Sequence, residues 1–234
     1  MKLLDVILAG LLFGAAHGVV AAENIEKDDY YTPHAQGCML VGDCTDDVTR
    51  VNSSIDLLHA FPDANWDLVE HEFDKIMIAF HKIGVKVFLG PEKYFPIGVR
   101  GTYHTVSNTF YLNRSFMHRP GVLMSVVRHE GWHAAQDCMA GSIDNSMIAI
   151  IHNEEDVPEI WQEITKNTYK FMPKAIPWEK EAMWAGKTAG MTQKALEACA
   201  AGEMWKVYKP TPKTAEWLRA VSYTHLTLPT KRIV

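Results

Sequence analysis

The sequence lacks a long run of basic side chains, and its acidic residues outnumber its basic ones. It contains 28 Asp and Glu residues against 23 Lys and Arg residues, which gives a formal net charge of −5. A protein that tracks a phosphate backbone needs Lys and Arg clustered along one face or groove. We therefore expect no nucleic acid among the partners of this protein.

No uninterrupted apolar run reaches the roughly 20 residues that a membrane-spanning helix needs. The N-terminal segment MKLLDVILAGLLFGAAHGVVAAE comes closest, but an aspartate, a histidine and three glycines interrupt it. A lysine precedes its apolar run, and small residues at positions 20–22 match a cleavage site. We interpret residues 1–22 as a secretory signal peptide. We expect an exported protein, periplasmic or extracellular, with no stable membrane anchor after cleavage.

Cysteine is scarce, and the C-x-x-C spacing of many metal sites is absent. The chain has four cysteines, Cys38, Cys44, Cys138 and Cys199. An even number in an exported chain predicts two disulfides. Because Cys38 and Cys44 lie close together in the sequence, we expect a local bond between them, which leaves Cys138 to pair with Cys199.

The composition, 47% apolar and 22% charged over 234 residues, is typical of one globular domain. Residues 23–62 are acidic and rich in turn-forming residues, so we expect a loop-dominated leader there. Residues 63–220 are predicted to form the folded domain. The last segment, 221–234, reads VSYTHLTLPTKRIV and looks like the translation of a sequencing-library adapter, so we expect a non-native tail.

The folded domain begins with a helix and a small sheet. Apolar residues recur at helical spacing over 65–82, and Gly84 would end that helix. Alternation predicts a strand over 85–89, and β-branched and aromatic residues predict a hairpin of strands 99–104 and 108–112. We therefore expect an α+β fold, mostly helical, with a small antiparallel sheet before the next helix.

That next helix is predicted from Pro120 to Gly141, because proline suits the first position of a helix and glycine its end. It contains the sequence HEGWH, with His129 and His133 four residues apart and therefore on one face. This spacing lets both imidazoles bind one tetrahedral Zn²⁺. The rest of the helix is largely apolar, and a polar face on a buried helix needs a partner, which a metal ion supplies.

Glu130 follows the first histidine and is turned about 100° from it on the helix. It would therefore flank a metal ion held by the histidines instead of binding it. A carboxylate in that position can act as the general base on a metal-activated water. The pattern H-E-x-x-H is the metallopeptidase motif.

A catalytic zinc site needs a third protein ligand and one open position. The candidates are Glu179 and Glu181, in the helix predicted after Pro177, and His152 and Asp156 in the preceding acidic connection. Glu179 and Glu181 are about 200° apart on a helix, so only one of them can face the metal.

The strand pair, the H-E-x-x-H helix and the later sequence E-K-E-A together resemble zincin metallopeptidases of the glutamate-ligand type, the gluzincins. The resemblance covers about residues 85–200. In several such families the third ligand is a glutamate with alanine three residues on, which implies Glu179 as the ligand and leaves Glu181 as the alternate. Ala182 and Gly186 share the Glu179 face and would let the two helices approach closely.

One position departs from the family pattern. Met183 stands where many relatives have an acidic or amide residue that orients the first histidine. Since metal-bound histidines usually donate their other N–H to an acceptor, we expect Glu181, Asp137 or a backbone carbonyl to take that place.

The resemblance implies a zinc-dependent peptidase or amide hydrolase that acts on a peptide or protein substrate, and the expected signal peptide implies that it is exported. The hairpin could hold an extended peptide by strand addition. Two alternatives remain open, a non-catalytic zinc-binding module of the same fold and a disulfide-stabilised secreted protein with a coincidental motif. A donor for the substrate's carbonyl oxygen would come from Tyr169, Tyr103, His104 or His152, each of which can equally be an ordinary hydrogen-bonding residue.

Overall fold

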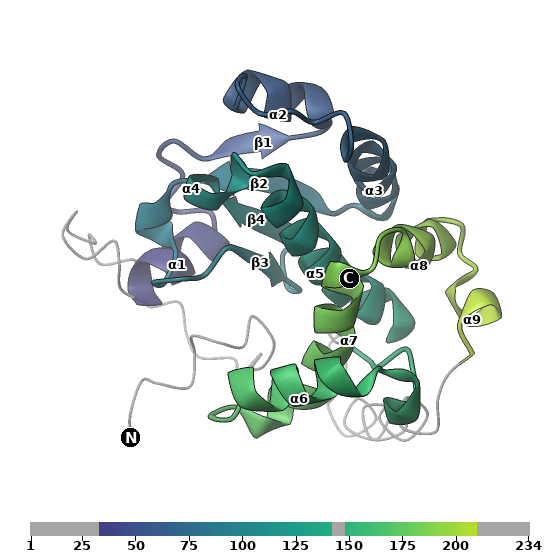
Figure 1. Cartoon of the computed structure of the whole chain (residues 1–234). Helices are drawn as coiled ribbons and strands as arrows, with labels where there is room; N and C mark the ends of the chain where they lie inside the picture. Colours follow the sequence, from purple (N-terminus) through teal and green to yellow (C-terminus); the bar gives the residue numbers. More distant parts are fainter. Residues whose placement is uncertain (1–32, 142–147, 210–234) are drawn as a thin grey trace, which may run out of the picture.

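The computed structural model describes residues 33–141 and 148–209, which form helices packed around a four-stranded sheet (Figure 1). The predicted α+β class is confirmed. The strands are β1 (Thr49–Val51), β2 (Lys86–Gly90), β3 (Gly101–His104) and β4 (Thr109–Asn113). The helices are α1 (Pro33–Leu40), α2 (Ser54–Ala60), α3 (Glu70–Ile83), α4 (Arg114–Met117), α5 (Pro120–Met139), α6 (Glu159–Thr168), α7 (Ile176–Lys187), α8 (Met191–Ala200) and α9 (Met204–Val207). Short 3-10 turns are η3 (Glu92–Tyr94), η5 (Glu154–Asp156) and η6 (Pro173–Ala175).

The sheet is mixed, which corrects the prediction of an antiparallel sheet. Its strand order is β1-β2-β4-β3, with β2 parallel to β4 and the two outer pairs antiparallel. The predicted hairpin is present as β3 and β4, where Tyr103 lies opposite Phe110. All five residues of β4 are buried, so this strand takes an inner position. The chain therefore crosses from β2 to the outer edge, forms β3 there, and returns as β4.

The described part of the expected leader is not dominated by loops. Residues 33–62 contribute α1, β1 and α2, and β1 pairs with β2 in the sheet. The reason is that a few apolar side chains among the acidic ones are buried: Val51 and Leu57 both belong to the main hydrophobic core. The expected signal peptide (1–22) and tail (221–234) lie outside the described residues.

Helix α5 lies at the centre of the fold and begins at Pro120, as predicted. It packs against β3, α3, α7 and α8 (Figure 1). Because it has neighbours on several sides, most of its second half is buried, including Trp132, which has no exposed surface. In the part of the chain that the structure describes, no helix is both long and apolar enough to cross a membrane.

Helix α3 also follows the sequence pattern, although it starts later than expected. It ends at Ile83, and Gly84 takes the left-handed conformation (φ 83°) that glycine favours at a helix end. The helix begins at Glu70 instead of residue 65, because the preceding residues form a turn.

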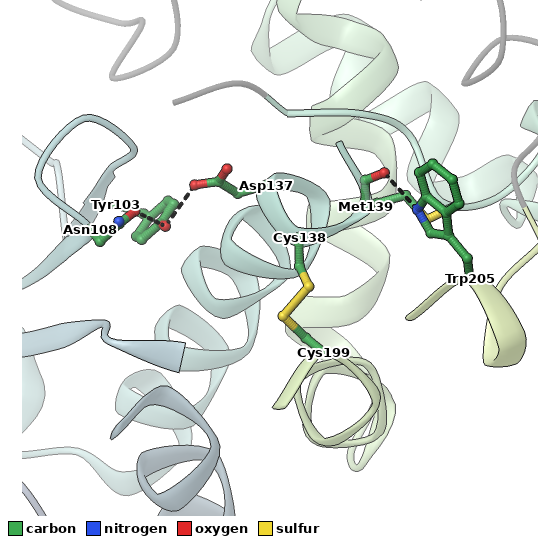
Figure 2. Close-up of a disulfide and its surroundings, with 7 residues drawn as sticks. All are labelled: Tyr103, Asn108, Asp137, Cys138, Met139, Cys199 and Trp205. Carbon is green, nitrogen blue, oxygen red and sulfur yellow. Dashed lines mark hydrogen bonds between the residues drawn. A yellow bond between two sulfur atoms is a disulfide. The ribbon is translucent and has the colours of Figure 1, made fainter. Parts of the chain in front are cut away.

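Both predicted disulfides are present. Cys38 pairs with Cys44 across six positions, and Cys138 pairs with Cys199 across 61 positions. Figure 2 shows the second bond joining the end of α5 to α8. Next to it, the Trp205 indole N–H donates to the carbonyl oxygen of Met139 at 3.1 Å. The C-terminal end of α5 is therefore held by a covalent bond and a hydrogen bond.

We expect the two disulfides to contribute unequally to stability. A cross-link restricts the unfolded chain more when its loop is longer, by about 4 kcal/mol for Cys138–Cys199 and about 2 kcal/mol for Cys38–Cys44. Denaturant unfolding of the Cys138→Ala/Cys199→Ala and Cys38→Ala/Cys44→Ala variants would measure this difference. An equal loss in the two variants would contradict the loop-length argument.

Candidate metal centre

Two helices bring together the two histidines of the motif and one glutamate. His129 and His133 lie on α5, and Glu179 lies in the first turn of α7. His129 Nε2 is 3.2 Å from Glu179 Oε2, and His133 Nε2 is 3.5 Å from Glu179 Oε1. The possible ligand atoms of the three residues all lie within 4.8 Å of one another, so the group could hold a metal ion.

The geometry of this group is compatible with metal coordination. Tetrahedral bonds of about 2.0–2.1 Å separate two ligand atoms by about 3.3 Å, which is close to both measured distances. Glu179 is buried, and its Oε2 has no hydrogen-bond partner among the described residues despite its closeness to His129. A buried carboxylate oxygen without a hydrogen bond is costly. A metal ion between the three side chains would remove that cost.

The structure distinguishes between the candidates for the third ligand. Glu181 points away from the histidines and accepts hydrogen bonds from Trp132 Nε1 and Gln136 Nε2. His152 stacks on Trp132, with ring centroids 5.7 Å apart, and Asp156 is exposed in η5. Only Glu179, of the four candidates, lies in the group with His129 and His133.

The close approach of α7 to α5 depends on small residues, as expected. A β-carbon added to Gly186 would lie 3.0 Å from the backbone oxygen of Ser125 and 3.2 Å from His129 Cβ. Ala182, one turn after Glu179, is completely buried. These two residues leave space for the α5 backbone, and the carboxylate of Glu179 can therefore reach the histidines.

Glu130 lies beside this group and contacts the edge of the sheet. Its Oε2 accepts a hydrogen bond from the backbone N–H of Tyr103 at 3.0 Å. The Tyr103 phenol donates to Asp137 Oδ2 at 2.9 Å and lies 3.1 Å from Asn108 Oδ1 (Figure 2). The candidate base is thus placed between the histidines and strand β3.

The charges of the site are strongly coupled. Burial alone would lower the pKa of His133, but the neighbouring Glu179 carboxylate raises it to about 9. Burial opposes the ionisation of Glu179, yet His133 and His129 hold its pKa well below the ordinary value. The metal-free site therefore favours a protonated imidazole next to a carboxylate, and a metal cation would replace that proton.

The candidates for a carbonyl donor occupy different environments. His104 Nδ1 lies 2.7 Å from Ser107 Oγ, and His152 packs among aromatic rings. Tyr103 directs its phenol towards Asp137. Burial and the negative charges of Glu179 and Glu130 raise the pKa of Tyr169. Its phenol therefore lies near the group formed by His129, His133 and Glu179.

The sequence pattern did not predict the role of Gln136. Its Oε1 lies 2.8 Å from His133 Nδ1, on the side of the imidazole opposite to Glu179. The available signal is its position, three residues after His133 and on the same helix face. Glu181 and Asp137 were among the candidates to orient His129 in place of a residue at position 183. Glu181 instead contacts Gln136, and Asp137 contacts Tyr103.

Comparisons with known proteins do not assign the chain to a family. No protein-family model matches it, and no curated protein or solved structure is significantly similar to it.

We expect Gly186→Ala to destabilise the crossing of α5 and α7. The added methyl group would contact a backbone oxygen, so the helices must separate, at a cost of about 1–3 kcal/mol. Denaturant unfolding of the metal-free protein measures this loss. Gly121→Ala is the matched control, because a β-carbon at this glycine of α5 meets nothing within 4 Å. Equal stability of the two variants would contradict the proposed packing.

The metal-free protein should lose stability as the pH rises. His133 has a folded-state pKa of about 9 against 6.5 for the free side chain, so its contribution is complete below pH 6.5 and lost as the pH passes through 9. Unfolding free energies measured across this range should fall for the wild type. In Glu179→Gln the fall should largely disappear, whereas Glu163→Gln, at an exposed position on α6, should retain it. A wild-type unfolding free energy that does not change over this pH range would refute the interaction between His133 and Glu179.

Proposed function

We propose that this chain is an exported zinc-dependent peptidase or amide hydrolase of the zincin type. The observation that carries the proposal is the convergence of His129, His133 and Glu179, with Glu130 next to them at the edge of the sheet. The two disulfides support export, because such bonds persist in oxidising compartments.

Zinc suits this donor set. Two imidazoles and one carboxylate make up one of the ligand sets of catalytic zinc sites, which keep a fourth position for water or substrate. The side chain of His129 is 18% exposed and those of His133 and Glu179 only 6% and 5%, so solvent reaches the group from the His129 side. When bound, Zn²⁺ polarises a carbonyl group and lowers the pKa of water to about 7.

Glu130 is the proposed general base. It would accept the proton of the attacking water and deliver it to the leaving amine. The hydrogen bond from the Tyr103 N–H holds its carboxylate in place and leaves Oε1 available for this transfer. Tyr169, whose phenol lies near Glu179, is the proposed donor to the oxygen of the reacting carbonyl.

An extended peptide is the proposed substrate. Strand β3 is an edge strand, and the Tyr103 N–H points to Glu130 instead of to β4. Backbone groups alternate in direction along a strand, so those of Gly101 face the same side. Because the Tyr103 N–H is bound to Glu130, a peptide would pair with Gly101 at this edge, next to Glu130 and the candidate metal ligands.

Two measurements test the proposal. Metal analysis of the purified protein should find one zinc ion per chain, and Glu130→Gln should retain the zinc but lose cleavage of a peptide library by at least about 100-fold. Glu155→Gln, at an exposed glutamate, is the control and should cleave normally. Zinc without cleavage in the wild type would favour the non-catalytic zinc-binding module, and absence of stoichiometric zinc would refute both.

A further inference from the structure

Behind His133, a buried amide connects the imidazole to a buried carboxylate. Gln136 has no exposed surface, and its Oε1 lies 2.8 Å from His133 Nδ1. Its Nε2 lies 2.7 Å from Glu181 Oε2 and 3.1 Å from the backbone oxygen of Trp178. These contacts join α5 to α7 on the side of His133 that faces away from Glu179.

The partners of Gln136 determine which way its amide points. A backbone carbonyl can only accept a hydrogen bond, and a carboxylate accepts as well. The amide nitrogen must therefore face Trp178 and Glu181, and the amide oxygen faces His133. Since that oxygen can only accept, His133 Nδ1 must carry a hydrogen, and the lone pair of the neutral imidazole is left on Nε2.

Glu181 is fixed in turn by donors. Its Oε2 accepts from Trp132 Nε1 at 3.1 Å, and its Oε1 accepts from the backbone N–H groups of Ile151 and His152 at 2.9 and 2.5 Å. An indole N–H and two backbone N–H groups can only donate. The carboxylate therefore cannot exchange donor and acceptor roles with Gln136, and the direction of the whole chain is set.

We propose that Gln136 and Glu181 are positioning residues that hold His133 with its hydrogen on Nδ1 and its Nε2 lone pair directed at the metal. This inference rests on the metal-binding part of the proposed function. Glu181 does not contact His129, His133 or Glu179 in this proposal; it acts on His133 through Gln136. Loss of such outer partners typically weakens metal affinity by about 10–100-fold.

Glu181→Gln removes one of the two acceptor oxygens that the carboxylate offers to its donors. The introduced amide nitrogen can only donate, and it would face N–H groups that now donate to the carboxylate. Gln136 would then keep only the Trp178 carbonyl as a partner for its Nε2, and its hold on the Nδ1 hydrogen of His133 would weaken. Gln136→Met removes the acceptor of the Nδ1 hydrogen and leaves the other donors to Glu181 in place.

The test is the zinc dissociation constant, measured by competition with a chelator, alongside the unfolding free energy of each metal-free variant. We expect both single variants to bind zinc about 10–100-fold more weakly than the wild type. Gln193→Met, at a glutamine that bonds to Glu197 on α8, is the control and should leave the dissociation constant unchanged.

Loss of stability in the single variants with unchanged dissociation constants would overturn the proposal and leave zinc binding itself intact. A wild type that binds no zinc would overturn both.

Discussion

The candidate site depends on how closely α7 crosses α5. A glutamate on one helix can meet two histidines on another only if the backbones approach closely, and Gly186 and Ala182 allow that approach. Around the crossing, Glu72 accepts hydrogen bonds from Arg128 of α5 and from the backbone N–H of Gly190. The turn after α7 is therefore held against both α3 and α5, and the crossing is supported from its other end.

The same crossing explains an unusually polar interior. His133, Gln136, Glu179 and Glu181 are all buried between the two helices. Each such group is costly unless its hydrogen bonds are complete. Burial raises the pKa of Glu181 to about 7, although several hydrogen bonds oppose that rise. Apolar side chains of similar size would avoid this cost, so the fold itself does not require polar groups at these positions.

Much of this arrangement follows from local sequence. The four-residue spacing of His129 and His133 places them on one face of any helix, and the cysteine spacing suggested both disulfides. Helical spacing also predicted that Ala182 and Gly186 share the face of Glu179 and allow a close helix approach. The described part of the leader and the parallel pairing of β2 with β4 were not predictable in this way. Strand partners and the burial of isolated apolar residues depend on distant parts of the chain.

The sequence by itself determined that two imidazoles share a helix face and that only one of Glu179 and Glu181 could join them. Tertiary structure alone decided which one, because that depends on how α7 is rotated about its axis where it meets α5. The rotation that directs Glu179 to the histidines turns Glu181 towards Trp132, Gln136 and the backbone of Ile151 and His152. Helical periodicity is a local property, whereas helix rotation is set by packing between residues far apart in the chain.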